Sequence, residues 1–388
     1  MLNVGVIGIG NTGNQVASLA KNKLHIPVLA INSSEKDLEV VPQDIPKKLI
    51  QNGSGFSQGA GKDRSLAKKY LKDSIMSLTG DKDIISMVAG DKDSGKDPLD
   101  VCFIISSTGG GTGSGTAIIL ADIMGQWFPD TKVILIGVLP VDNEGESSHV
   151  NTLQYLDELY KNLPDQTYIL YDNDKLAGLP TYQILEKVNN EIVSDIDVLR
   201  CTFNYSTKYD SIDDRDMTRL ISFPGRIMIS RLEGFRERDT DSQSIEDMII
   251  DSIKRNCHVE PQRDKKVVAS GVITNLSQAL TEEFDDNIPK VREFVGEPIH
   301  AFNHIAVNDE KKEPNNVFTI VTGLTPINDR ITKISERIDE IRERQKVLAE
   351  ESALASVDLE GLSDAIKDKE KDDTSGSLDI ASIFSKYE

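Results

Sequence analysis

Seven consecutive residues in the first third of the chain include five glycines. They read Gly109-Gly110-Gly111-Thr112-Gly113-Ser114-Gly115 and follow an apolar stretch. Glycine is unfavourable inside a helix, by roughly 0.5–1 kcal/mol relative to alanine, so a turn that only packs closely would use one or two. Backbone N–H groups at the start of a helix bind anions, and the two hydroxyl groups add donors. The run therefore predicts a loop that wraps around phosphate groups.

A second glycine-rich loop, Gly8-Ile9-Gly10-Asn11-Thr12-Gly13, comes near the start of the chain. It has the GxGxxG spacing of phosphate-binding turns between a strand and a helix. One interpretation is an NAD-linked oxidoreductase, which needs an acid at the end of the second strand to hold the ribose. That strand ends in Asn32-Ser33-Ser34 instead. The oxidoreductase stays an alternative, although it leaves residues 109–115 unexplained and offers no obvious proton-transfer residue.

Two further patterns are weaker. Residues 90–96 have P-loop spacing, but Asp97 stands where a serine or threonine would bind Mg²⁺, so we predict an ordinary loop. His300 and His304, with Cys257-His258 upstream, could form a zinc site. We favour ordinary surface and core histidines here.

The loops must be positioned by the elements around them. In the first half, β-branched runs at 2–7, 27–32, 100–106, 132–139 and 167–171 alternate with helical patterns at 14–23, 64–78, 112–127 and 148–162. This alternation predicts an α/β fold with a parallel sheet covered by helices on both faces. Ligands of such sheets bind at the carboxyl ends of the strands, which is where both glycine-rich loops fall.

The second half has a different pattern. A long helix is expected at 181–200. Strands at 226–231, 266–274, 304–307 and 317–322, with helices at 245–255 and 277–284, predict a second, mixed α/β domain. A C-terminal helix then begins at Thr325-Pro326. Its isoleucine stripe could pack on the chain's own second domain or on a partner. Residues 356–388 are polar and acidic, which predicts a flexible tail.

Composition excludes some classes of function. The 388 residues include 44 Lys+Arg and 64 Asp+Glu, a net charge of −20. We therefore expect no direct nucleic-acid binding through the surface. No apolar run approaches the ~18–20 residues of a membrane helix, so we expect no membrane insertion. Three scattered cysteines and the absence of a signal peptide favour a cytoplasmic protein.

The sequence GGGTGSG at 109–115 resembles the signature of the tubulin/FtsZ superfamily of GTPases. Segments 8–14, 32–34, 59–63, 140–145 and 173–176 resemble the family's other nucleotide loops in order, and the likeness covers residues 1–325. It implies a GTP-binding domain at 1–180, a core helix at 181–205 and a second (activation) domain at 206–324. A C-terminal helix at 325–355 and the acidic tail at 356–388 complete this organisation.

The resemblance also implies the ligands GTP and GDP with Mg²⁺, without assigning a protein ligand to the metal. The phosphate, ribose and base contacts carried over from the family are Gly10, Asn11, Thr12, Gly13, Asn14, Asn32, Gly59, Ala60, Gly61, Gly109, Gly110, Gly111, Thr112, Gly113, Ser114, Glu144, Asn173 and either Asn189 or Asn190. The choice between the last two stays open because they are adjacent on one helix.

Residues 208–217 resemble the family loop that one subunit inserts into its neighbour's nucleotide site. Asp213 and Asp216 match its two acids, whereas Ser211 and Lys208 depart from its Asn and Gly. Carboxylates can orient water or hold Mg²⁺ beside a phosphate, so the resemblance implies that these two acids are catalytic. If they are not, the chain would be a scaffold that assembles without hydrolysis.

The resemblance implies head-to-tail homopolymers with assembly-coupled GTP hydrolysis. Residues 148–153 and the divergent catalytic loop look most like the phage and plasmid tubulins PhuZ and TubZ, which implies DNA segregation or phage DNA positioning. Residues 378–384 look like the C-terminal peptide of FtsZ, so an FtsZ-like cell-division protein is the alternative. The tail at 356–388 is the candidate contact for an adaptor or a DNA-binding partner.

Overall fold

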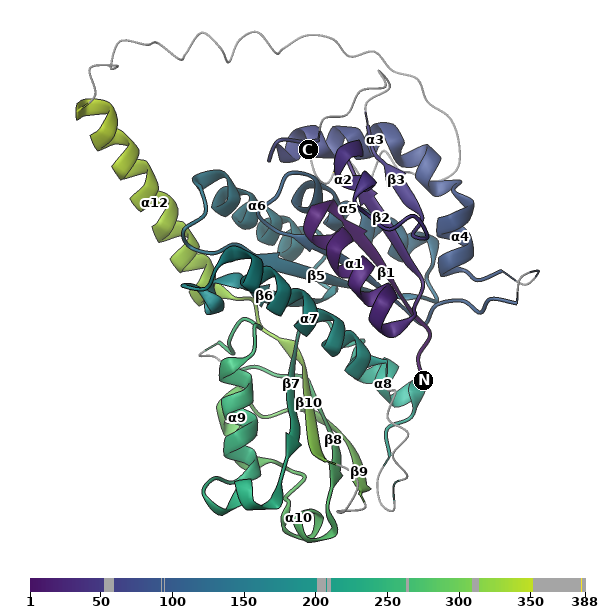
Figure 1. Cartoon of the computed structure of the whole chain (residues 1–388), viewed down its shortest axis with the longest axis vertical. Coiled ribbons are helices and arrows are strands. Elements are labelled where there is room, and N and C mark those ends of the chain that lie inside the picture. Colours follow the sequence, from purple (N-terminus) through teal and green to yellow (C-terminus); the bar gives the residue numbers. More distant parts are fainter. Residues whose placement is uncertain are drawn as a thin grey trace.

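The computed structural model describes residues 1–51, 59–91, 93, 95–200, 207, 211–262, 265–308, 314–351 and 385. One ten-stranded sheet runs through it in the order β3-β2-β1-β4-β5-β6-β7-β10-β8-β9 (Figure 1). The strands are β1 (Val4–Ile9), β2 (Val28–Asn32), β3 (Lys47–Leu49), β4 (Val101–Ser107), β5 (Lys132–Leu139), β6 (Thr167–Asp172), β7 (Gly225–Phe235), β8 (Ala269–Leu276), β9 (His300–Val307) and β10 (Asn315–Leu324).

The helices connect and cover these strands. They are α1 (Gly10–Leu24), α2 (Glu35–Glu39), α3 (Arg64–Thr79), α4 (Lys82–Val88), α5 (Thr112–Trp127), α6 (Glu146–Asn162), α7 (Thr181–Leu199), α8 (Asp214–Leu220), α9 (Ile245–Arg255), α10 (Gln278–Glu283), α11 (Pro289–Val295) and α12 (Asn328–Glu351), with 3₁₀ turns η1 (Asn173–Leu176) and η2 (Glu237–Asp241).

The α/β fold class predicted from the sequence is confirmed. The seven strands from β3 to β7 are parallel, β10 is antiparallel to β7 and β8, and β9 is parallel to β8. Residues 167–169 of β6 pair with residues 225–227 of β7. The two halves of the chain therefore share one continuous sheet, and the strands of the expected second domain extend the sheet of the first.

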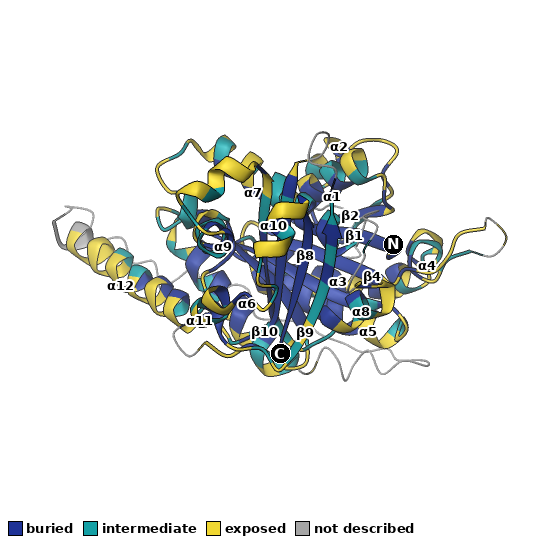
Figure 2. Ribbon diagram, turned by 90° about the horizontal axis from the view of Figure 1, so that it is seen from below, coloured by how far each residue is buried: buried dark blue, intermediate teal, exposed yellow. Residues whose placement is uncertain are grey.

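Successive strand residues face opposite layers of helices. Val4 and Val6 of β1 belong to an apolar cluster with α1 and α7, whereas Ile7 and Ile9 belong to a second cluster with α3, α5 and α6. Figure 2 shows the buried strands between more exposed helices. Burial on both faces explains why the first-half strands read as continuous apolar runs.

The C-terminal helix differs from its prediction in two ways. It begins at Asn328 instead of at Thr325-Pro326. Its buried residues Ile334 and Ile338, with Ile327 just before the helix, join the cluster of α3, α5 and α6, so it packs mainly on the first half of the chain, and Asp329 also donates its backbone N–H to Gln262 of the second half at 3.0 Å. Figure 1 shows the far end of α12 projecting beyond the body.

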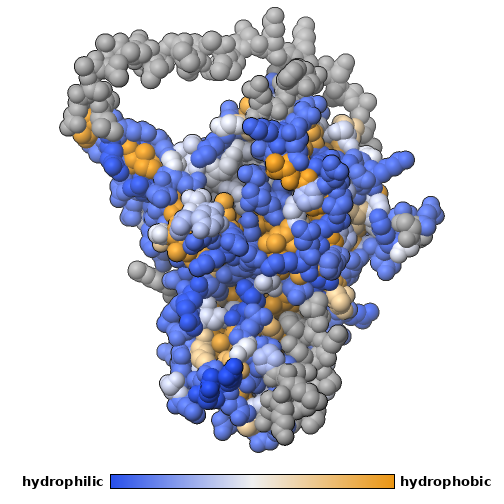
Figure 3. Space-filling model, in the orientation of Figure 1, coloured by the Kyte–Doolittle hydropathy of each residue, from blue (hydrophilic) through white to orange (hydrophobic). Residues whose placement is uncertain are grey.

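The surface is mostly polar. On the face seen in Figure 3, apolar residues form small separate patches among hydrophilic ones, in keeping with the net charge of −20. Among the described residues, no helix combines the length and the apolar character needed to cross a membrane.

A buried polar cluster joins α7 to the strands at the junction of the two halves. Asp195 of α7 accepts hydrogen bonds from the Tyr171 hydroxyl and the His258 ring, both at 2.7 Å, and from Arg231 Nε at 2.8 Å. Glu191, one turn earlier, accepts the backbone N–H of Cys257 at 2.6 Å. Among the described residues, Glu191, Asp195 and His258 are also the one set close enough to hold a metal. Both Asp195 oxygens are already engaged within the chain, whereas Nδ1 of His258 is buried without a hydrogen-bond partner.

Glu191→Gln is expected to stabilise the protein at alkaline pH. Burial, followed by repulsion from Asp195, raises the pKa of Glu191, so the folded state penalises the carboxylate once the pH exceeds the ordinary value of 4.5. Glutamine keeps an oxygen for Cys257 and removes the charge. Thermal unfolding at pH 8 should show Tm raised by about 1–2 °C, because an unfolding entropy of about 2.1 cal/mol/K per residue converts roughly 1 kcal/mol into little more than 1 °C for a chain of 388 residues.

The difference in Tm should shrink as the pH falls toward 4.5, because wild-type Glu191 then becomes protonated too. Glu186→Gln, at an exposed position on the same helix, is the matched control and should show no such trend. A Tm difference that does not change with pH would contradict the explanation.

Candidate nucleotide site

A pocket of about 500 Å³ opens at the carboxyl ends of β1, β2, β4 and β5. This is the edge where ligands of parallel sheets bind. Thirteen of the predicted contacts line it: Gly10, Asn11, Thr12, Asn32, Gly59, Ala60, Gly61, Gly109, Gly110, Gly111, Thr112, Gly113 and Glu144. Two glycine-rich loops about 100 residues apart in sequence thus meet in one cavity, together with a third loop at 59–61.

Glycine at position 111 lets two of these loops touch. A Cβ atom there would lie 2.9 Å from both the Cα and the backbone nitrogen of Lys62. At Gly110, by contrast, a Cβ would meet nothing within 4 Å, although the residue lines the pocket. The backbone of the run is therefore packed behind Gly111 and open in front of Gly110, as a loop that surrounds an anion must be.

Helix α6 fixes this glycine run from behind. The side-chain amide of Asn151 donates to the carbonyl oxygens of Gly109 at 3.2 Å, Gly110 at 3.1 Å and Lys62 at 2.9 Å. On the other side of the pocket, the hydroxyls of Ser33 and Thr112 lie 2.6 Å apart. These bonds hold the loops in place before any ligand binds.

Two predicted contacts lie behind the pocket wall. A Cβ on Gly13 would meet the carbonyl oxygen of Ile105 at 2.1 Å, so this glycine lets α1 approach β4. Ser114 is fully buried, and its hydroxyl donates to the carbonyl oxygen of Gly110. Both residues shape the loops and do not line the cavity.

Six residues line the pocket without having been named as contacts. Ile9, Ser34 and Lys62 lie within the predicted loops 8–14, 32–34 and 59–63, whereas Lys36, Asp37 and Ser107 lie outside every predicted loop. Lys62 is the most informative of these. Its backbone has a positive φ of 67°, and its ammonium donates to the Ser148 hydroxyl at 2.6 Å. Its place directly after Gly59-Ala60-Gly61 was the signal available in the sequence. Lys36 and Lys62 are the cationic side chains among the described lining residues, and both suit an anionic ligand.

Three predicted ribose or base contacts lie outside the cavity with buried polar atoms that have no hydrogen-bond partner. These atoms are both side-chain polar atoms of Asn14, Oδ1 of Asn173 and Oδ1 of Asn189. Asn189 donates to Gln15 Oε1 at 3.4 Å, and Gln15 donates to Asn11, which lines the pocket, at 3.2 Å. Buried polar groups are nearly always paired, so these exceptions on α1, η1 and α7 need an explanation.

The neighbouring Asn190 is different. It accepts the Lys23 ammonium at 2.5 Å and donates to the Glu186 carbonyl at 2.7 Å. Its polar atoms are thus engaged within the chain, and it lies on a more exposed face of α7.

Asp213 and Asp216 lie away from this pocket. Each carboxylate accepts the other residue's backbone N–H, at 3.4 Å and 2.8 Å, which forms a capping box at the start of α8. The neighbouring Asp214 contacts the amino group of Met1 at 2.7 Å. Figure 1 shows α8 beside the start of β1, whereas the pocket begins at its end. The six residues of β1 separate the two by about 20 Å. Lys208 lies outside the described residues.

The weaker motifs do not contribute to the pocket. In residues 90–96, the backbones of Asp91 and Lys96 exchange two hydrogen bonds of 2.9 Å, which close a short hairpin. The candidate zinc ligands have different partners. His258 contacts Asp195, whereas His304 Nδ1 accepts the backbone N–H of Ile212 at 3.2 Å. Neither His300, His304 nor Cys257 belongs to a metal-capable group among the described residues.

Comparison with known proteins shows which family uses this arrangement. Residues 3–180 match the description "Tubulin/FtsZ family, GTPase domain". This segment is a tubulin/FtsZ GTPase domain. It contains β1 to β6, both glycine-rich loops and every residue that lines the pocket.

Relatives of the GTPase domain are distant. A tubulin-like protein CetZ of Pyrococcus horikoshii is 31% identical over 195 residues, which is 49% of this chain and 50% of that protein. The chain thus spans about half the length of the curated relatives it matches.

Solved structures extend the likeness in fold beyond the GTPase domain. The GTPγS-form protofilament of TubZ from Bacillus thuringiensis serovar israelensis has a TM-score of 0.72 at 19% identity, over 90% of this chain and 94% of that one. TubZ of Clostridium botulinum phage c-st, without its C-terminal tail, has a TM-score of 0.68 at 19% identity, over 88% and 98%. The fold of the described chain beyond residue 180 is therefore also tubulin/FtsZ-like.

Proposed function

We propose that this protein binds and hydrolyses GTP in head-to-tail filaments, and that each active site is completed by the next subunit. The observation that carries the proposal is the separation of two functional groups along one strand. The pocket lies at the end of β1, and the acids Asp213 and Asp216 lie near its start. Translating one copy along this axis brings the acids of one subunit to the pocket of the next.

Guanine is the base that the family resemblance implies, and the buried asparagines are compatible with it. Its ring edges offer both N–H donors and carbonyl or ring-nitrogen acceptors, so it can pair with the unsatisfied atoms of Asn14, Asn173 and Asn189. An unpaired buried group costs about 1–3 kcal/mol, and pairing three residues at once would contribute strongly to binding. Of the two candidates on α7, Asn189 is therefore the proposed contact and Asn190 is not.

Phosphates would occupy the glycine-lined part of the pocket. Backbone N–H groups and the Thr112 hydroxyl supply donors, and Lys36 and Lys62 supply positive charge. Asp37 and Glu144 also line it, and carboxylate oxygens are among the ligands that Mg²⁺ prefers. Bound between these groups and the phosphates, Mg²⁺ would neutralise part of the ligand's charge.

The incoming acids would act on the attacking water. In the capping box, Asp213 uses Oδ1 and Asp216 uses Oδ2, which leaves the second oxygen of each for a water molecule or a cation. The box also fixes the direction of both side chains before a neighbour arrives. A carboxylate that accepts a hydrogen bond from water aligns its lone pair with the terminal phosphate. Hydrolysis would then require assembly.

The oxidoreductase alternative lacks its ribose-binding acid. Asn32 occupies that position, and its Oδ1 accepts the backbone N–H groups of Ser33 at 2.8 Å and Ser34 at 3.3 Å. Nucleotide extracted from the purified protein separates the two functions, since we expect GDP or GTP and no nicotinamide.

The biological setting belongs to the same proposal. The likeness in fold to TubZ of a phage favours a cytoplasmic filament for DNA segregation or phage DNA positioning over an FtsZ-like division role. Of residues 356–388, the proposed contact for an adaptor, residue 385 alone is among the described residues.

The deciding experiment measures GTP turnover per subunit against protein concentration, with sedimentation of the same samples. We expect turnover near zero below a threshold concentration, with pelleting that begins at the same threshold. Turnover per subunit that is constant while nothing pellets would show a site complete within one chain. Assembly without GTP turnover would indicate instead a scaffold that assembles but does not hydrolyse GTP.

A further inference from the structure

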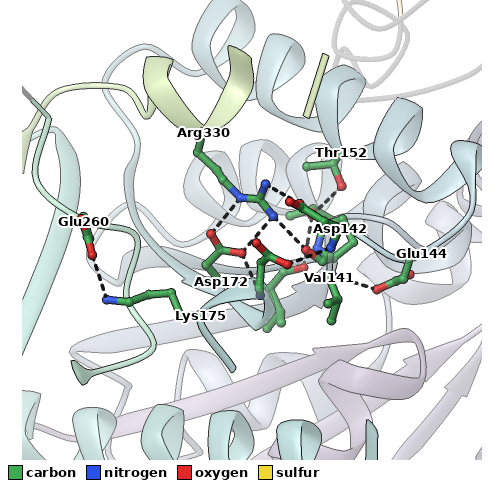
Figure 4. Close-up of polar contacts among 12 residues, drawn as sticks. Val141, Asp142, Glu144, Thr152, Asp172, Lys175, Glu260 and Arg330 are labelled. Atoms are coloured by element: carbon green, nitrogen blue, oxygen red, sulfur yellow. Dashed lines mark hydrogen bonds and ion pairs between the residues drawn. The ribbon is translucent and has the colours of Figure 1, made fainter. Parts of the chain in front are cut away.

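The C-terminal helix reaches the nucleotide half of the molecule through one buried arginine. Arg330, in the first turn of α12, has only 6% of its side chain exposed. It lies between the loop after β5 and the end of β6 (Figure 4). No sequence pattern pointed to this residue, and the proposed mechanism does not use it.

Every nitrogen of the Arg330 guanidinium has a partner. Nε and Nη2 donate to the two oxygens of Asp172, at 2.8 Å and 3.2 Å. Nη1 donates to Asp142 Oδ1 at 2.7 Å, and Nη2 also reaches the Pro140 carbonyl at 3.1 Å. We call Arg330, Asp142 and Asp172 the α12 clamp. The paired, planar geometry is one that arginine makes and lysine cannot.

The clamp is connected to the pocket on its loop side. Asp142 lies two residues before Glu144, which lines the cavity. The backbone N–H of Glu144 donates to the Val141 carbonyl at 3.0 Å, and its carboxylate accepts the Val141 N–H at 3.2 Å. The loop is therefore a tight turn, and its position depends on the residues that Arg330 holds.

On its other side, the clamp touches the turn that carries Asn173. Asp172 caps η1 by accepting the backbone N–H of Asp174 at 3.1 Å, and Asp174 in turn accepts the N–H of Asp142 at 3.0 Å. One guanidinium thus bridges the loop with Glu144 and the turn with Asn173, the two segments expected beside the ribose and the base.

Farther along α12, two more arginines extend the contact. Arg337 Nε donates to the Asp142 carbonyl at 2.8 Å, and Arg342 Nε donates to Glu146 at 2.7 Å. Glu146 begins α6, the helix whose Asn151 holds the glycine run. The length of α12 that lies on the body is therefore tied to the segments that shape the pocket.

We infer that Arg330 is a positioning residue for nucleotide binding, so that the seating of α12 on the body and the occupancy of the pocket are thermodynamically linked. The inference rests on the proposed function, since it assumes that the ligand is a guanine nucleotide. Linkage is reciprocal: unseating α12 weakens nucleotide binding, and bound nucleotide holds α12 in place. A partner that pulls on the projecting end of α12 would then promote nucleotide release.

The test uses the full chain and a fluorescent GTP analogue. Arg330→Gln removes the charge, and Arg330→Lys keeps it without the paired geometry. We expect both to raise the dissociation rate of the nucleotide, by about 5- to 150-fold, the usual range of coupling between sites. Lys333→Gln is the control: it lies one turn along α12 and makes no hydrogen bond or ion pair with the clamp within the described part of the chain. It should leave the rate unchanged.

A second measurement distinguishes a positioning role of Arg330 from a purely structural one. Tm is measured with and without saturating GTP, together with hydrogen exchange of residues 328–342. If Arg330 is a positioning residue, GTP should slow hydrogen exchange of residues 328–342 in the wild-type protein. The Arg330→Lys variant should lose most of this protection. A lower Tm with an unchanged dissociation rate and unchanged protection would overturn the inference.

If Arg330→Gln does not fold, Asp142→Asn tests the same clamp from the loop side, where 43% of the side chain is exposed. It should also speed nucleotide release, and an unchanged rate would count against the clamp. Wild-type protein that binds no guanine nucleotide would overturn the proposed function, and the inference with it. Normal wild-type binding with unaffected variants would overturn the inference alone.

Discussion

Asp213→Asn is expected to reduce GTP turnover at least about 100-fold while filaments still form, since groups that move or orient a proton contribute about 10²–10⁴-fold. Asparagine caps a helix about as well as aspartate, so α8 should keep its start and the acceptor for the Asp216 N–H. What the variant loses is the negative charge. The measurement is turnover and sedimentation on the same samples.

Asp214→Asn is the matched control, because Asp214 is the adjacent carboxylate and its contact is the Met1 amino group. It should keep nearly full turnover. If Asp213→Asn also keeps it, Asp213 has only its capping role, and the chain is a scaffold or has another catalytic group.

Gly111→Ala is expected to lower nucleotide affinity by about 10- to 100-fold. The new methyl group would lie 2.9 Å from backbone atoms of Lys62, which are not free to rotate away. Extra atoms in a tightly packed place cost about 1–3 kcal/mol, and here they separate the glycine run from the loop at 59–62. Titration with a fluorescent GTP analogue measures the affinity, and Tm checks that the chain folds.

Gly125→Ala provides the comparison on α5, the helix that begins directly after Gly111. A Cβ at Gly125 would meet nothing within 4 Å, so the fold should keep or gain stability, with unchanged affinity. Equal affinity in Gly111→Ala and wild type would show that contact between the two loops does not matter for binding.

The two variants together test whether sites are shared. A subunit with Gly111→Ala has a damaged pocket and intact acids, and a subunit with Asp213→Asn has the reverse. Mixed filaments contain junctions where an intact pocket meets intact acids. Turnover in the mixture should therefore exceed the sum of the two proteins alone, whereas a site within one chain would give only that sum.

Much of the fold could be predicted because local patterns were strong. Helix α5 and strand β5 lie where the sequence placed them, at 112–127 and 132–139. Strand β3 (Lys47–Leu49) and helices α4 and α11 were missed, because three to seven residues show too little of a repeating pattern.

Glycine was the strongest local signal for the site, and the family resemblance added Asn32 and Glu144. The glycine run was found because five glycines in seven residues are far more than a closely packed turn needs. Lys36 and Asp37 look ordinary in sequence, and they line the pocket because α2 begins just after the end of β2. Arg330 could not be predicted, since its partner Asp172 lies 158 residues earlier. The isoleucine stripe of α12 predicted that the helix forms, but it did not predict the surface on which the helix packs.

The position of α8 at one end of β1, with the pocket at the other, has a consequence for how a polymer would grow. When each subunit joins the next through two unlike surfaces, one surface of each kind stays exposed at the ends of the polymer. Such a polymer would therefore be polar, with two different tips. One tip presents an open pocket where nucleotide can exchange, and the other presents only acids. An excess of subunits with a damaged pocket should therefore block addition at one tip and spare the other.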